Sequence, residues 1–148
     1  TFTSSPPLDL TITLSRIIAK LHIVSTDERT ASVTKIRTTY SAGGKSFNPT
    51  TGLATVNDGF AVTNTPSSAV TTLDVGNYAF LATDEQTMDI TIEALDAGEN
   101  VLFTKVVSNV PLRRNRVTTL TGQVFTAGTS SATFQVDSDW LEGNEVPF

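Results

Sequence analysis

His22 is the only histidine of the chain and the first residue whose type could support catalysis. A neutral imidazole accepts a proton from a hydroxyl nucleophile when a carboxylate orients the ring. The sequence places no such partners beside His22, which follows Lys20 in an alternation of apolar and polar residues. A surface or packed histidine is therefore the favoured interpretation, and we expect a protein that is not an enzyme.

Paired carboxylates at Asp27–Glu28 and Asp84–Glu85 could serve acid–base hydrolysis if two of them faced each other across a cleft. Both pairs lie next to the ends of expected strands, and polar strand ends are the favoured interpretation. The segment "DSDWLEG" at 137–143 begins like a calcium-binding loop, but Leu141 occupies its third ligand position and Gly143 comes one residue late. We therefore expect a solvated acidic tail, and we predict neither a metal ion nor a cofactor.

The segment "GGKS" at 43–46 contains the end of a phosphate-binding motif. The full motif needs a glycine five positions before Gly44, where this chain has Thr39. The segment also separates two expected strands, whereas a phosphate-binding loop joins a strand to a helix. A tight turn that uses positive φ at Gly43-Gly44 is predicted instead.

Three of the six arginines, Arg113, Arg114 and Arg116, fall within four positions. Guanidinium groups suit carboxylates and phosphates, so an anionic partner or a glycan is one interpretation. A second is packing of the arginine stems over apolar surface. The favoured interpretation is structural: an exposed polar lead-in to the following strand, where charges keep a sheet edge from pairing wrongly.

The composition narrows the class of protein. A chain of 148 residues with 39% hydrophobic and 17% charged residues has enough apolar material for one folded domain. A net charge of −5 argues against general nucleic-acid binding and against electrostatic docking on an anionic membrane. The absence of cysteine excludes disulfides, zinc–thiolate sites and a cysteine nucleophile. The opening "TFTSSPPLDL" lacks the basic and apolar regions of a signal peptide.

Threonine is the most informative excess, with 26 Thr and 13 Ser among the 148 residues. Threonine is β-branched and suits the exposed face of a strand, so we expect an all-β protein. Residues 57–77 are expected to be loop-rich, and no long helix is expected. The alternation predicts about seven to nine short strands, at 10–24, 31–40, part of 46–56, 77–83, 87–95, 101–110 (ended by Pro111), 116–126 and 132–140.

The segment 10–24, "LTITLSRIIAKLHIV", fits one face of a helix as well as one face of a strand. No N-cap followed by an acidic residue precedes it, so a strand is predicted. Residues 1–7, which contain a double proline, are expected to form a lead-in or linker. Residues 8–148 are then expected to form a single β-sandwich or barrel domain.

Several of these segments, in order from about residue 10 to residue 142, resemble the fimbrillin superfamily. That family comprises the pilin and pilus-anchor lipoproteins of certain Gram-negative gut and oral bacteria. Residues 10–24 resemble its opening pattern L-T-R-x-x-A-K-L/V, and 31–55 its strand followed by F-N-x-x-T-G. "VPLRRNRVTTLTGQVFT" resembles its signature V-P-L-K-R-N-x-x-T-x-x-x-G-x-x-x-T. The positions with motif counterparts include Arg16, Lys20, Pro111, Arg114, Asn115, Thr118 and Gly122.

The resemblance implies a transthyretin-like Greek-key β-sandwich that is exported to the cell surface and assembles into fimbriae. Subunits of the family polymerise by strand exchange with other fimbrial subunits, which is a form of β-augmentation. The candidate donor segments are "LDLTITL" at 8–14 and the end of the chain from residue 132. Membrane attachment would come only through a lipid anchor upstream, and the chain would be the C-terminal domain of a longer precursor or a trimmed form. Arg113 and Arg116 match no fixed motif position, so they are expected to face solvent or a partner.

A second class of function remains open from the sequence. An extracellular β-sandwich can hold a glycan or a host protein in its loops, because loops on a rigid scaffold commonly carry function. Residues 57–77 are the natural site, with Phe60 and Tyr78 as the nearby aromatic residues. No nucleic acid is expected as a partner.

Overall fold

A computed structural model of the chain describes residues 15–67, 69–126 and 133–136, and these residues form two packed β-sheets. The all-β sandwich predicted from the sequence is confirmed, and no helix occurs within the described ranges. The eight strands are β1 (Ala19–Ser25), β2 (Lys35–Tyr40), β3 (Phe60–Asn64), β4 (Asp74–Ala79), β5 (Glu85–Leu95), β6 (Val101–Arg113), β7 (Val117–Gly122) and β8 (Thr133–Val136).

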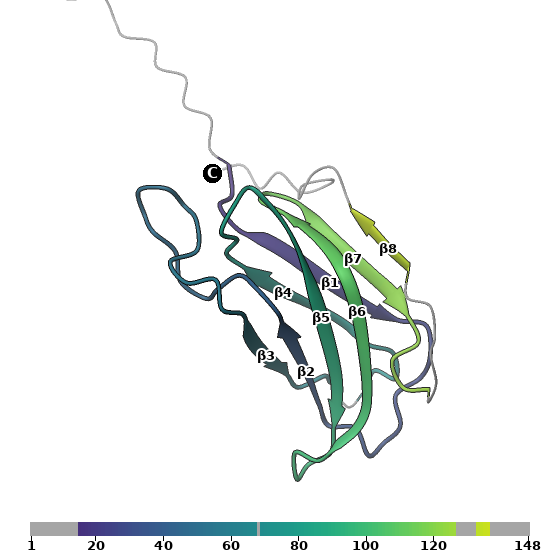
Figure 1. The fold of residues 1–148 in the computed structure, drawn as a ribbon. Helices are drawn as coiled ribbons and strands as arrows, with labels where there is room; N and C mark the ends of the chain where they lie inside the picture. Colours follow the sequence, from purple (N-terminus) through teal and green to yellow (C-terminus); the bar gives the residue numbers. More distant parts are fainter. Residues whose placement is uncertain (1–14, 68, 127–132, 137–148) are drawn as a thin grey trace, which may run out of the picture.

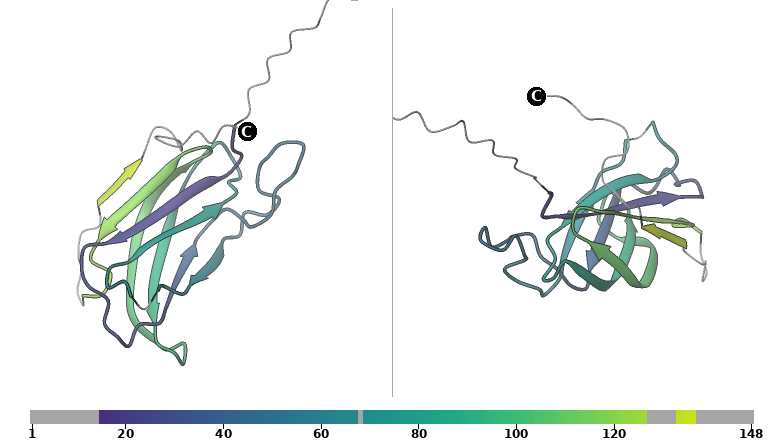
Figure 2. Two further views of the ribbon diagram at one scale, coloured as in Figure 1. Left: turned by 180° about the vertical axis from the view of Figure 1, so that it is seen from behind. Right: turned by 90° about the horizontal axis from the view of Figure 1, so that it is seen from above.

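Each sheet has four strands (Figures 1 and 2). The first, sheet A, has the order β4-β1-β7-β8, and the second, sheet B, has the order β3-β2-β5-β6. Strands β1 and β7 run parallel, and the other neighbouring pairs run antiparallel. Because β6 and β7 follow each other in the chain but lie in different sheets, the turn between them carries the chain from sheet B to sheet A.

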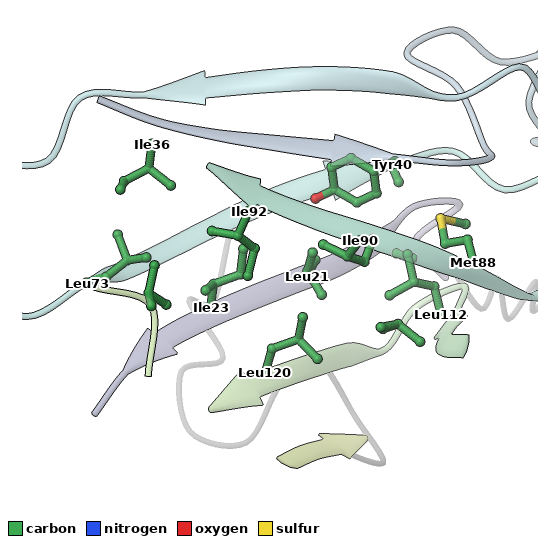
Figure 3. Packing of buried hydrophobic residues seen from close by; sticks show 14 of the residues in the cluster. Leu21, Ile23, Ile36, Tyr40, Leu73, Met88, Ile90, Ile92, Leu112 and Leu120 are labelled. Carbon is green, nitrogen blue, oxygen red and sulfur yellow. The ribbon is translucent and has the colours of Figure 1, made fainter. Parts of the chain in front are cut away.

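The core lies between the two sheets and follows the alternation of the sequence. The predicted inner face of β5, with Met88, Ile90, Ile92 and Ala94, is buried. Figure 3 shows Ile90 and Ile92 in the same layer as Leu21 and other apolar side chains of sheet A. The period-two pattern therefore predicted correctly which face of β5 points inward.

The prediction that 57–77 is loop-rich holds for 57–59, 65–67 and 69–73, but it missed two strands, because β3 and most of β4 fall within that range. Both are edge strands with one neighbour each. An edge strand buries less surface than a central one, so β3 and β4 form with polar and small residues such as Asn64, Gly76 and Asn77. Those residue types suggested turns in the sequence.

Two further predictions needed correction at strand ends. Strand β1 begins at Ala19, so residues 15–18 of the predicted strand 10–24 precede it, and 10–14 lie outside the described residues. Pro111 does not end a strand, because β6 continues to Arg113 and pairs Pro111 with Thr87. Strand β6 is an edge strand, and an edge tolerates proline because its missing N–H can lie on the side without a neighbour.

The turn predicted at "GGKS" is confirmed in part: Gly43 has a φ of 77°, whereas Gly44 forms an isolated bridge with Phe80. The predicted strand piece within 46–56 is reduced to a single bridge between Phe47 and Ala54. The lead-in at 1–7 and the acidic segment at 137–143 lie outside the described residues, as do the side chains of β8.

Candidate functional site

The arginine turn, Arg113–Arg116, connects β6 to β7 at the crossover between the sheets. Asn115 adopts a φ of 55°, in the left-handed region where asparagine is among the most tolerated residues. The Asn115 N–H donates to the carbonyl of Ile18 at 2.9 Å, just before β1 begins. This hydrogen bond therefore fixes the turn to the start of β1, in sheet A.

Arg114 joins this turn to two other segments. Its guanidinium Nη1 donates to Asp84 Oδ1 at 2.7 Å, and its backbone N–H donates to the Asp84 carbonyl at 2.9 Å. A side chain added at Gly52 would place its Cβ 3.0 Å from Arg114 Nη2, so the loop 47–54 passes directly over the guanidinium. Only 22% of the Arg114 side chain is exposed, as expected for an arginine that holds segments together.

Arg113 and Arg116 contact residues next to them, on the neighbouring strand or in the turn itself. Arg113 forms an ion pair with Glu85, its cross-strand neighbour on β5, and both side chains are largely exposed. Arg116 donates from Nη1 to the carbonyl of Asn115 at 3.2 Å. Two of the arginines, Arg113 and Arg114, therefore pair with Glu85 and Asp84, although the sequence offered the arginine cluster and the acidic pair as separate candidate sites.

The other motif positions also have structural roles or lie at the surface. The buried Thr118 hydroxyl donates to the carbonyl of Pro111 at 2.7 Å and so ties β7 to β6 across the crossover. Gly122, at the far end of β7, accepts the N–H of Thr26 through its carbonyl at 2.9 Å. Arg16 is exposed near the start of the described chain. The motif residues of the turn surround the crossover between the sheets.

Asp27 is a structural residue that the sequence did not reveal. Its carboxylate accepts the N–H groups of Val124 and Phe125 and the hydroxyl of Thr126, each at 2.8 Å. Burial opposes the charged form, but these hydrogen bonds outweigh it and hold the pKa of Asp27 below its ordinary value. The sequence signalled only an acidic residue near a strand end, since the groups that it binds lie nearly a hundred positions away.

His22 Nε2 lies 2.7 Å from Asp74 Oδ1, on the outer face of sheet A. The contact joins β1 to the edge strand β4 across the surface. Lys20, also on β1, lies across Gly76 of β4, where an added Cβ would meet Lys20 Cε at 2.7 Å. The described residues contain no group of three or more His, Cys, Asp or Glu side chains placed to hold a metal ion.

A small polar cluster lies inside the sandwich between β2 and β4. The Asn64 amide donates to the Asn77 carbonyl oxygen at 2.8 Å. The Thr38 hydroxyl, the Tyr40 hydroxyl and the Asn77 amide nitrogen are buried and make no hydrogen bond within the described structure. Burial raises the pKa of Tyr40 far above its ordinary value, and the nearby Asn77 amide offsets a small part of this rise.

The predicted ligand site in 57–77 is divided by the fold. Phe60 lies in β3 and stacks on Tyr40, with ring centroids 4.4 Å apart and planes 9° apart. Tyr78, in contrast, is 54% exposed on the outer face of β4. A surface hollow beside residues 65–71 is bordered by Arg29, whose guanidinium donates to three backbone carbonyls, those of Val33, Ser67 and Val70. The two aromatic side chains therefore do not form one site.

The profile of a family of unknown function, DUF6562, matches residues 1–145. The chain belongs to this family. No curated protein matches the sequence of the DUF6562 chain.

The DUF6562 chain is similar to a solved crystal structure described as that of "a putative cell adhesion protein" from Bacteroides ovatus ATCC 8483. The TM-score is 0.52 and the sequence identity is 16%. The match covers 86% of this chain and 46% of that chain, so the DUF6562 chain spans less than half the length of the similar protein. At this identity the likeness shows a shared fold. None of the described residues forms a helix with the length and hydropathy needed to cross a membrane.

Proposed function

We propose that this DUF6562 chain is a non-enzymatic subunit of the bacterial cell surface that acts in adhesion. In its finer form, the proposal is a fimbrial subunit or anchor-like protein that assembles with other subunits by exchange of β-strands. The described fold is like that of a protein called a putative cell adhesion protein, which supports the coarser statement. The ordered resemblance to fimbrillins supports the finer one.

One observation carries the proposal: the charged groups that might have formed a reaction centre take part in holding the sandwich together. Arg114 binds Asp84, and Arg113 binds Glu85. Asp27 accepts three hydrogen bonds from the segment after β7. What the described sandwich offers for interaction is then the backbone of its edge strands. Strand exchange needs such edges, because an added strand pairs with their N–H and C=O groups.

The cellular setting belongs to the same proposal. The chain is exported and displayed on the outer membrane or on a fimbrium, with membrane attachment supplied by a lipid anchor upstream of residue 1. Its partners are further fimbrial subunits and, for adhesion itself, glycans or proteins on host or bacterial surfaces.

Two measurements on producing cells test the proposal. Antibodies against the folded chain should label intact cells, and brief treatment of intact cells with a protease should remove that label. The purified chain should form species larger than a monomer in light scattering as its concentration rises. A chain found only after cell lysis, and monomeric at every concentration, would contradict both the location and the mode of assembly.

A further inference from the structure

Among the described residues, β4 is the last strand of sheet A, and its outer edge is regular and points away from β1. The Lys20 N–H of β1 donates to the Arg116 carbonyl, on the side of β7. Successive residues of a strand direct their backbone hydrogen bonds to opposite sides, so Ala19, Leu21 and Ile23 direct theirs towards β4. The partners of those residues in the β1–β4 register are Val75, Asn77 and Ala79, whose backbone groups therefore face β1. The N–H and C=O groups of Asp74, Gly76 and Tyr78 consequently face away from β1.

The contacts just beyond β4 support this assignment. Phe80 is next in the outward-facing series, and its N–H and C=O pair with Gly44 at 3.1 and 3.0 Å. The loop at Gly44 therefore covers the outward side of the chain directly after β4. Within β4, the described residues form no second ladder, since β4 is the last strand of sheet A.

Strand β6, the longest edge, carries several features that hinder pairing. Its register with β5 shifts near Asn109, which has a φ of 59°, and again near Leu102. Pro111 lacks an N–H. Lys105 pairs with the buried Ile92, which places Lys105 on the core-facing side of the edge. Bulges, proline and an inward charge are the devices by which natural sheets protect their edges.

The remaining edges are short. Strand β3 has five residues and β8 has four, whereas β4 pairs over six consecutive positions with no register shift. The seam between β3 and β4 also has apolar groups that are only partly covered: Phe60, Val62 and Val75 pack against the core but keep some exposure. A strand added to β4 would lay its inward side chains over this seam and bury them.

One segment of this chain has the pattern that such a strand requires. In "LDLTITL", at 8–14, four apolar residues alternate with Asp9, Thr11 and Thr13. Seven residues in extended form reach about 23 Å, enough to run along all of β4. The other candidate donor, at the end of the chain, contains β8, which is already paired with β7.

We propose that the outward side of β4, at Asp74 and Gly76, accepts Leu8–Leu14 of a second copy of this chain. The inference rests on the proposed strand exchange and names its acceptor and its donor. The apolar side chains of the added strand cover the seam beside β3, and its aspartate and threonines continue the outer face of sheet A. Charge agrees with this placement, because the Lys20 side chain lies over Gly76 of β4, where Asp9 of the added strand can meet it.

The cysteine-free sequence makes a direct test possible. One preparation of the full chain carries Thr11→Cys, and a second, isotope-labelled preparation carries Tyr78→Cys. The two are mixed, concentrated and mildly oxidised, and mixed disulfides are measured by mass. The matched control replaces Tyr78→Cys by Val106→Cys on the outer face of β6, where the side chain is 62% exposed compared with 54% for Tyr78.

We expect several-fold more mixed disulfide with Tyr78→Cys than with Val106→Cys, because paired strands bring outer-face Cβ atoms within disulfide reach. If light scattering shows assembly but cross-linking at Val106 is equal or greater, β4 is not the acceptor strand. The proposed strand exchange itself would not be contradicted by that result. A disulfide that forms only within one chain carrying both Thr11→Cys and Tyr78→Cys would overturn the second copy as donor. Monomers without cross-links would overturn the inference and the proposed assembly together.

A charge exchange tests the register independently. Asp9→Lys in every copy should weaken self-association several-fold, and Lys20→Asp in every copy should do the same. The chain that carries both substitutions should recover association, because opposite charges again face each other. Failure of the double variant to recover, while both single variants remain folded by circular dichroism, would count against the placement of Asp9 beside Lys20.

Discussion

Arg114 and Asp84 bind each other twice, through a guanidinium–carboxylate contact of 2.7 Å and a backbone hydrogen bond of 2.9 Å. The double contact fixes the start of β5 to the turn that follows β6. Together with the ion pair between Arg113 and Glu85, it makes the acidic pair and these two arginines one structural contact. Each supplies the other's counter-charge at the crossover between the sheets.

Replacing Arg114→Ala should lower the free energy of unfolding by about 1–2 kcal/mol, since it removes an ion pair and the guanidinium packed under Gly52. Arg113→Ala is the matched control, because that side chain is 49% exposed compared with 22% for Arg114. Its loss should cost less than about 0.5 kcal/mol. Urea denaturation of both variants measures the difference, and equal losses would contradict a structural role specific to Arg114.

Asp27→Asn should destabilise the chain in a pH-dependent way. The folded state holds the pKa of Asp27 below the ordinary value of 3.8, so the carboxylate stabilises the fold at neutral pH. That stabilisation is present above the ordinary pKa and is lost as the pH falls through the lowered one. At pH 7 the variant should lose about 1–3 kcal/mol, since a charged acceptor of three hydrogen bonds is weakened.

The measurement is a series of urea denaturation curves from about pH 7 to about pH 2. The difference in the free energy of unfolding between Asp27→Asn and the unchanged chain should shrink as the pH falls. The neighbouring Glu28 is exposed, so Glu28→Gln serves as the control and should change little. A gap that stayed constant across the acidic range would show that Asp27 acts without its charge.

How much of the fold can be predicted from sequence depends on burial. Strand β5 is central in its sheet, and its alternation of apolar and polar residues gave the correct inner face. Strand β3 and the first part of β4 were missed because an edge needs few apolar residues, and Gly76 is more typical of turns; the strand predicted at 77–83 overlaps only the end of β4. Pro111 misled for the same reason, since an edge strand can contain a residue that a central strand cannot.

The contacts of the site are less predictable than the strands. The sequence showed that Arg113, Arg114 and Arg116 cluster, but the counter-charges of Arg113 and Arg114 lie about thirty positions away, at the start of β5 and directly before it. Asp27 reaches across nearly a hundred positions to the segment after β7. Such pairings depend on the order of strands in each sheet, and local periodicity does not report that order.

Tyr40→Phe tests the polar cluster inside the sandwich. The Tyr40 hydroxyl is buried and has no hydrogen-bond partner within the described structure, so its removal should raise the free energy of unfolding by up to about 1 kcal/mol. Thermal or urea denaturation measures the change, with Tyr78→Phe at an exposed position as the control. A clear loss of stability would instead indicate that a bound water connects this hydroxyl to Thr38 or Asn77.

Tyr78→Pro should leave the monomer folded and prevent its assembly. The Tyr78 N–H faces away from β1, so a proline there removes a donor that the β1–β4 ladder does not use.

Val106→Pro is the matched control on β6. The Ser41 N–H donates to the Asp89 carbonyl, so the backbone groups of Asp89 and Thr91 on β5 face β2. Val106 is opposite Thr91, so its N–H faces away from β5. Both variants should keep the far-ultraviolet circular dichroism spectrum of a folded β-protein and a cooperative unfolding transition. Light scattering should then show larger species for Val106→Pro and monomers for Tyr78→Pro, and the reverse result would move the acceptor edge from β4 to β6.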